Sequence, residues 1–150
     1  MGRILVVIAI TVMCITASGN ASAVEPLNYS DKTGPTLRVQ LSSFLKNTYD
    51  TALSDYQIAD IDLNNDGIDE YILKQRRCSI IDKSCTHLVI AEKQNEIFEL
   101  SRIKAQNLMV GGTLSHGIKD LLAFNDEIND YKFDIYVWSP PQKMYIIKAE

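Results

Sequence analysis

Residues 56–74 read YQIADIDLNNDGIDEYILK, and this stretch decides how the chain folds. Apolar and polar residues alternate from Tyr56 to Ile61 and again from Glu70 to Lys74, which is the pattern of a β-strand with one buried face. Between the two runs, the sequence Asn-Asn-Asp-Gly at 64–67 favours a turn. The stretch therefore predicts two antiparallel strands joined by a polar, acidic loop.

One helix is predicted before this hairpin and several short strands after it. Apolar residues recur at helical spacing behind Pro35, so we expect a helix from Pro35 to Tyr49. Strand-like runs follow at 86–90, 96–103, 107–110, 120–124, 131–138 and 144–148, with turn-rich links that include Gly111-Gly112. The predicted fold class is α+β, with one N-terminal helix followed by an antiparallel β-meander of about seven or eight strands.

Length and composition indicate one globular domain. The chain has 150 residues, of which 46% are hydrophobic and 23% charged, so wholesale disorder is excluded. Fifteen basic and nineteen acidic residues give a formal charge of -4, which argues against a generally basic surface for nucleic acid. We expect an irregular arm at 24–36 and a single α+β domain at 37–150.

The first 23 residues have the layout of a secretory signal peptide. Arg3 precedes an almost wholly apolar run from Ile4 to Ala17, and Ala21-Ser22-Ala23 supplies a small-residue cleavage pattern. The alternative is a membrane anchor, but about 14 apolar residues are too few for the roughly 20 that a bilayer requires. We therefore expect cleavage after Ala23, a periplasmic or secreted protein, and no later membrane span.

Two cysteines, Cys78 and Cys85, remain after the predicted cleavage. An even pair in an exported chain favours a disulfide that closes a short loop between two strands. A redox-active pair is the alternative, but the sequence lacks the C-x-x-C spacing.

The acidic loop has the residue pattern of a calcium site. Oxygen-bearing side chains recur at alternate positions and again at the end of the loop, and Gly67 lets the backbone turn sharply. The predicted side-chain ligands are Asp62, Asn64, Asp66 and Glu70. The backbone carbonyl of Ile68 is the predicted fifth ligand. Ca²⁺ takes six to eight such hard oxygen ligands. An EF-hand is excluded because its twelfth position, which requires glutamate, holds Leu73. A metal-free Asx-rich turn is the alternative.

The nine-residue spacing from Asp62 to Glu70 resembles the calcium loops of FG-GAP and VCBS-type repeats. It is also similar to a group of small exported bacterial proteins that combine this loop with a nearby cysteine pair and a later Gly-x-x-Asp-Leu stretch, here at Gly117–Leu121. The resemblance covers roughly residues 56–124 and implies a calcium ion that fixes a β-hairpin. Asn64 replaces the commoner aspartate, which should weaken the site. Propeller proteins carry many such loops, whereas this chain has one and is too short for a whole propeller.

A second stretch of the chain echoes the hairpin. Gly67–Leu73 and Gly117–Ala123 each place an acidic residue three positions after a glycine and just before an apolar strand. The match is either coincidence or the trace of two related hairpins, of which only the first has the acidic loop.

The sequence offers no recognised catalytic motif. The only histidines are His87, within a strand-like run, and His116, beside a glycine in a predicted turn. There is no G-x-S-x-G elbow and no paired-histidine or C-x-x-C metal motif. We therefore assign no catalytic residue.

The last strands contain most of the aromatic side chains. Under strict alternation, Phe133 and Ile135 share one face, and Tyr136 and Trp138 share the other. An apolar strand face usually belongs to the core. The alternative is that Tyr136 and Trp138 anchor a protein partner.

The sequence therefore favours a small, exported, non-enzymatic binding protein stabilised by Ca²⁺ and a disulfide. An inhibitor or immunity protein that acts on a cell-envelope enzyme suits its size, its acidity and the lack of a catalytic motif. The alternatives are a small envelope hydrolase that uses His87 or His116, and a calcium-dependent structural or adhesion module.

Overall fold

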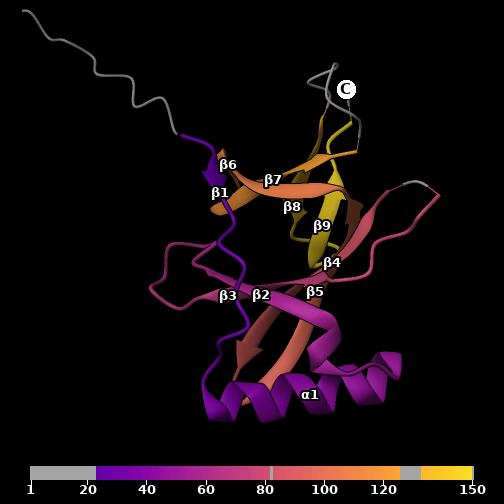
Figure 1. Ribbon diagram of the computed structural model, residues 1–150. Coiled ribbons are helices and arrows are strands. Elements are labelled where there is room, and N and C mark those ends of the chain that lie inside the picture. Colours follow the sequence, from indigo (N-terminus) through magenta and orange to yellow (C-terminus); the bar gives the residue numbers. More distant parts are fainter. Residues whose placement is uncertain (1–22, 82, 126–132, 150) are drawn as a thin grey trace, which may run out of the picture.

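The computed structural model describes residues 23–81, 83–125 and 133–149 (Figure 1). Helix α1 spans Pro35–Tyr49, as predicted, and a short 3₁₀ helix η1 spans Leu53–Asp55. The strands in these residues are β1 (Glu25–Pro26), β2 (Tyr56–Ile61), β3 (Glu70–Gln75), β4 (Cys85–Lys93), β5 (Glu96–Ala105), β6 (Asn107–Ser115), β7 (Ile118–Phe124), β8 (Phe133–Ser139) and β9 (Met144–Ile147). Within the described residues, no helix is both long and apolar enough to cross a membrane. The predicted signal peptide lies outside them, except for Ala23.

The strands form two antiparallel sheets. One has the order β2-β3-β4-β5 and the other the order β1-β6-β7-β8-β9. Apart from β1, each sheet is a meander of neighbouring strands, because short connections favour antiparallel pairing. The predicted α+β class is confirmed, with the meander divided between two sheets.

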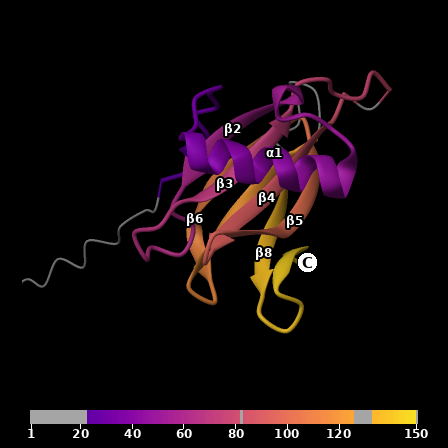
Figure 2. The ribbon, with the colours of Figure 1, turned by 90° about the horizontal axis from the view of Figure 1, so that it is seen from below.

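The main core lies between the two sheets, and a second core lies under the helix. Ile72 and Val89 from one sheet pack with Val110 and Leu121 from the other. Helix α1 lies across the outer face of the β2–β5 sheet (Figure 2). Its Leu45 and its fully buried Leu41 contact that face, and burying each contributes roughly 1.5–3 kcal/mol. The β2–β5 sheet is therefore covered on both faces.

The amino-terminal arm is tied to both sheets. Pro26 in β1 pairs with Met109 of β6, and Ser30 exchanges two backbone hydrogen bonds of 2.8 and 2.9 Å with Ile58 of β2. Leu27 and Tyr29 pack against the main core. The arm is thus more regular than we predicted, because these contacts satisfy its backbone and bury its apolar side chains.

The prediction of a turn at Gly111-Gly112 is wrong. Strand β6 continues through both glycines to Ser115, with a register shift between Val110 and Leu114. A Cβ on Gly111 would lie 3.2 Å from the carbonyl oxygen of Asp120. Glycine therefore permits close strand approach at a β-bulge, and the turn comes later, at His116-Gly117.

Candidate metal loop and its surroundings

The predicted metal loop joins β2 to β3, and its base is fixed by the core. Leu63 is 1% exposed, and its carbonyl accepts a 2.8 Å hydrogen bond from the backbone N–H of Lys119 in β7. Further along the loop, Asn65 and Gly67 adopt positive φ angles of 57° and 83°. Glycine adopts such a φ without strain, which explains its place at the sharpest part of the loop.

Two aspartates accept hydrogen bonds from the loop's own backbone. The Asp62 carboxylate accepts from the N–H groups of Asp66 (3.2 Å) and Gly67 (2.9 Å). Asp66 Oδ1 accepts from the N–H of Ile68 at 2.8 Å. These Asx-type contacts hold the loop in a compact conformation.

Glu70 is the buried carboxylate of the loop. It is 8% exposed, and its Oε2 accepts a 2.8 Å hydrogen bond from the N–H of Leu63. Burial raises the pKa of Glu70, and the nearby charges of Asp66 and Asp62 raise it further, while the Leu63 hydrogen bond opposes them. The site is therefore an accumulation of negative charge, partly withdrawn from water.

Asn64 links the carboxylates. Its Nδ2 donates to Asp66 Oδ2 (2.9 Å) and to Glu70 Oε1 (3.4 Å), and its Oδ1 accepts from the N–H of Asp66 (2.9 Å). Asn64, Asp66 and Glu70 thus meet directly, while Asp62 joins them through the loop backbone. Ile68, whose backbone carbonyl is the fifth predicted ligand, is 62% exposed. Among the described residues, no group of three or more His, Cys, Asp or Glu side chains is arranged to hold a metal ion.

The β6–β7 hairpin contains a matching carboxylate. Asp120 is 3% exposed, and its Oδ2 accepts a 2.5 Å hydrogen bond from Thr113 Oγ1. Glu70 likewise accepts from Leu63, so in each hairpin the donor lies seven residues before the acid. Oδ1 of Asp120 has no hydrogen-bond partner among the described residues. The sequence echo therefore corresponds to a shared structural feature.

Tyr145 of β9 connects the surroundings of the two acids. It is 2% exposed, and its hydroxyl donates a 2.8 Å hydrogen bond to the carbonyl of Lys119. Burial raises the pKa of Tyr145 far above its usual value, with smaller contributions from the charges of Glu70 and Asp120. Its neutral hydroxyl thus ties β9 to the strand that holds the base of the acidic loop.

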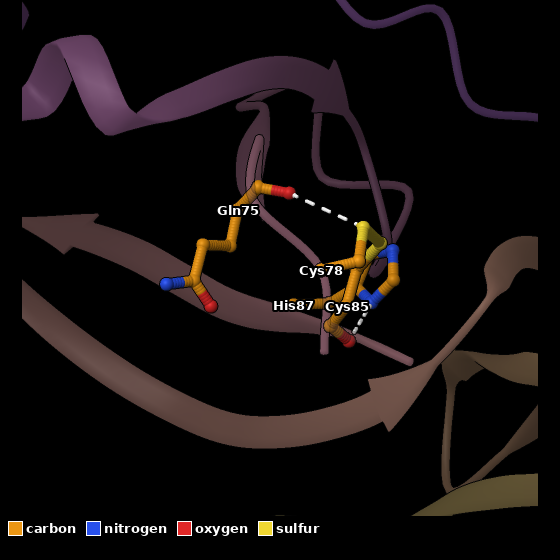
Figure 3. The surroundings of a disulfide bond; sticks show 4 residues. All are labelled: Gln75, Cys78, Cys85 and His87. Atoms are coloured by element: carbon orange, nitrogen blue, oxygen red, sulfur yellow. Dashed lines mark hydrogen bonds between the residues drawn. A yellow bond between two sulfur atoms is a disulfide. The ribbon is translucent and has the colours of Figure 1, made fainter. Parts of the chain in front are cut away.

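The cysteine pair forms the predicted disulfide (Figure 3). Cys85 is buried at the start of β4, whereas Cys78 is exposed and lies with its Sγ 4.0 Å from the carbonyl oxygen of Gln75 at the end of β3. The bond therefore fastens the β3–β4 connection to the start of β4.

Neither histidine is placed at the acidic loop. His87 is fully buried in β4, and its ring Nδ1 lies 3.1 Å from the carbonyl oxygen of Cys85 (Figure 3). Burial lowers the pKa of His87 to about 4, and the charge of Lys74 also lowers it. His116 is exposed in the β6–β7 turn with a φ of 54°. The environment of His87 is that of a structural residue.

Tyr136 and Trp138 pack against the main core, and Trp138 meets Tyr145 edge-on at 5.7 Å between ring centroids. The structure therefore favours core packing for this pair. On the same strand, Phe133 is 44% exposed.

Two features of the structure were not predicted from the sequence. The Thr113–Asp120 contact was signalled by the echo around Gly117, but the donor lies in a stretch that we predicted to follow a turn. Ile80 and Ile81 are 95% and 97% exposed in the disulfide loop. The sequence signal that could have indicated this exposed apolar pair is its position between two cysteines that form a disulfide.

The fold and the site define a two-sheet α+β protein with an acidic hairpin loop and a disulfide-closed loop. Comparison with models of known protein families, with curated proteins and with solved structures found no match to this chain.

Proposed function

We propose that the Asp62–Glu70 loop binds one Ca²⁺ ion and that the ion stabilises a small exported binding protein. The observation that carries this proposal is the meeting of Asn64, Asp66 and the buried Glu70 in one loop. The fourth predicted side-chain ligand, Asp62, accepts hydrogen bonds from the backbone of the same loop. All the donors are hard oxygens, which Ca²⁺ prefers. A cation would also relieve the repulsion among the carboxylates.

Asn64 is the residue whose contacts change on binding. Its NH₂ group donates to two of the proposed ligands, the carboxylates of Asp66 and Glu70. To act as a ligand, the amide turns so that Oδ1 faces the ion. Its hydrogen bonds to Asp66 and Glu70 would then be lost, and the oxygen atoms of all three side chains would be free to hold the ion.

The ion's role follows from where the loop is attached. The loop base is bonded to β7 through Leu63 and Lys119, and its last ligand begins β3. Binding therefore fixes one sheet relative to the other. We assign the ion no catalytic role.

For the whole protein we propose inhibition of, or immunity against, an enzyme of the cell envelope. The size of the chain, its acidity and its paired cysteines support an exported protein that acts by occupying a partner's surface. Copurification from the native envelope fraction should yield one stoichiometric protein partner. Recovery of the protein alone from that fraction would count against this role.

Calorimetric titration of the chelator-treated protein with CaCl₂ tests the metal site directly. We expect one binding event in the intact protein and none in Asp66→Ala. The matched control is Asp69→Ala, which removes a neighbouring exposed carboxylate that the predicted spacing does not use. No heat in the intact protein, or equal loss in both variants, would refute the proposed ligand set.

A further inference from the structure

The amino-terminal arm covers part of one edge of each sheet. Strand β1 is the outermost strand of the β1-β6-β7-β8-β9 sheet, and Ser30 bridges to β2, the outermost strand of the other sheet (Figure 1). An edge strand presents unpaired N–H and C=O groups that can pair with another chain. The arm therefore occupies the outer edges of β6 and β2 where it pairs with them, and its release would open both.

Between these two attachment points, Tyr29 of the arm packs beside His87. Their ring centroids lie 6.3 Å apart, and the hydroxyl of Tyr29 and Nε2 of His87 are both buried with no hydrogen-bond partner among the described residues. Lys74 of β3, which pairs with His87, places its Nζ 5.6 Å from the centroid of the same tyrosine ring. The arm therefore contacts the imidazole through its aromatic ring and not through a hydrogen bond.

The surroundings of His87 disfavour its charged form. Burial holds the pKa of this fully buried side chain near 4, the charge of Lys74 lowers the pKa further, and the backbone of Cys85 in β4 and Ile103 in β5 opposes these effects. Strands β3 and β5 are joined to β4 by continuous ladders, whereas the arm is joined to the sheets by the two residues of β1 and by one bridge. Lifting the arm is therefore the smallest rearrangement that brings water to the ring.

We propose that the arm is an acid-released strap and that Tyr29 and His87 form its latch. In the closed form, a proton on His87 adds a charge beside Lys74 in a fully buried site. Release of the arm hydrates that charge and bares the outer edges of β2 and β6. The released form is a minor state at neutral pH. The strap does not depend on the acidic loop or on Ca²⁺.

The linkage between protonation and release sets the size of the expected effect. The pKa of His87 is about 4 in the closed form, against 6.5 for an ordinary histidine in water. The released form therefore binds the proton more tightly, and release becomes more favourable as the pH falls from 6.5 towards 4. Between pH 7.5 and pH 4.5, the equilibrium constant for release should rise about 70-fold.

Hydrogen exchange of single amides, followed by NMR, tests the strap. The reporters are the N–H groups of Ser30 and Ile58, each of which donates to the carbonyl of the other. After correction for the intrinsic exchange rate, their protection should fall about 70-fold between pH 7.5 and pH 4.5, and at both pH values it should be lower than that of the β4 amides. Protection that does not change with pH, or that equals that of β4 at both values, would overturn the strap.

Two substitutions assign the release to His87. His87→Leu should abolish the fall in protection at Ser30 and Ile58. The matched control is Asp31→Asn, which removes the ion pair between the arm and Arg76 and should retain the fall. A fall that persists in His87→Leu, or one that disappears in Asp31→Asn, would mean that the latch lies elsewhere.

Variants of Tyr29 test the latch without changing the histidine. In an NMR titration of the imidazole, Tyr29→Phe retains the ring and should leave the pKa of His87 at about 4. Tyr29→Ala uncovers the imidazole and should raise its pKa by at least about 1, towards 6.5. An unchanged pKa of His87 in Tyr29→Ala would show that the arm does not shield the ring, and the proposal would fail.

Discussion

The β2–β3 and β6–β7 hairpins each bury one carboxylate near the start of their second strand, but their two strands are joined by different kinds of connection. Glu70 and Asp120 each accept a hydrogen bond from a donor seven residues earlier. The first hairpin closes through an acidic loop, whereas the second closes through the two residues His116 and Gly117, both at positive φ.

The difference separates what a hairpin needs from what a ligand site needs. The β6–β7 hairpin shows that two residues with positive φ are sufficient to join antiparallel strands in this fold. The additional carboxylates at Asp62 and Asp66 are therefore unnecessary for strand pairing, and they increase repulsion near Glu70. This excess of acid is the physical argument for a cation at the first hairpin.

The largest predicted effect comes from His87 in β4, which pairs with Lys74 in the second strand of the first hairpin. Burial holds the pKa of His87 at about 4, against 6.5 for an ordinary histidine. As the pH falls from 6.5 towards 4, the unfolded chain gains a proton that the folded chain does not, so the free energy of unfolding falls. We expect a loss of about 3 kcal/mol over this range, measured by urea unfolding at a series of pH values.

One substitution tests whether His87 causes that pH dependence. His87→Leu should reduce the slope between pH 6.5 and 4, even though it removes the contact with Cys85. The same slope in the His87 variant as in the intact protein would show that another group controls acid stability.

The next effect is specific to the first hairpin. Ca²⁺ at about 100 times its Kd should add roughly 2.7 kcal/mol to the free energy of unfolding if only the folded state binds it. Thermal melts with Ca²⁺ and with EGTA should therefore differ by several degrees in the intact protein and coincide in Asp66→Ala. A calcium response that survives in Asp66→Ala but disappears in Asp69→Ala would show that the ligand register is wrong.

Local patterns in the sequence were sufficient to predict most elements but not their long-range contacts. Apolar spacing behind Pro35 gave the helix bounds, and alternation gave β2 over Tyr56–Ile61. The two glycines of β6 were misread because glycine marks both turns and bulges, and only the approach of Asp120 distinguishes them. The bond between Lys119 and Leu63 joins residues 56 positions apart, so no local pattern encodes it.

The candidate site shows the same limit. The spacing of Asp62, Asn64 and Asp66 identified an oxygen-rich loop, and the structure brings the last two into contact. The burial of Glu70, the first residue of β3, could not be predicted, because no local pattern shows that residues of the other sheet, such as Tyr145, lie near it. The exposure of Ile80 and Ile81 was also hidden, since apolar residues beside strands are normally buried.

The third prediction probes the acid of the second hairpin. Thr113→Val removes the one hydrogen bond that the structure gives to the Asp120 side chain, and it should lower the free energy of unfolding by about 1–3 kcal/mol. Thr113→Ser keeps the hydroxyl and should have little effect. If Thr113→Val is as stable as the intact protein in urea unfolding, the buried Asp120 does not depend on this contact. In the first hairpin the equivalent donor is a backbone N–H, which a side-chain change cannot remove.

The smallest effect compares the glycines of the two turns. Gly67 and Gly117 have φ angles of 83° and 81°, and an added Cβ would meet no atom within 4 Å at either position. The cost of alanine is therefore confined to the backbone, and we expect each Gly→Ala variant to lose about 1 kcal/mol in EGTA. Asparagine, which tolerates positive φ better, should lose less at both positions.

The two alanine variants should differ from each other only when Ca²⁺ is added. Gly67→Ala disturbs the loop that holds the proposed ligands, so its Kd for Ca²⁺ should rise. Gly117→Ala should bind Ca²⁺ like the intact protein. Thermal melts and calorimetric titration of the pair measure both quantities. An identical calcium affinity in the two variants would mean that the backbone conformation at Gly67 serves only to join the strands, as it does at Gly117.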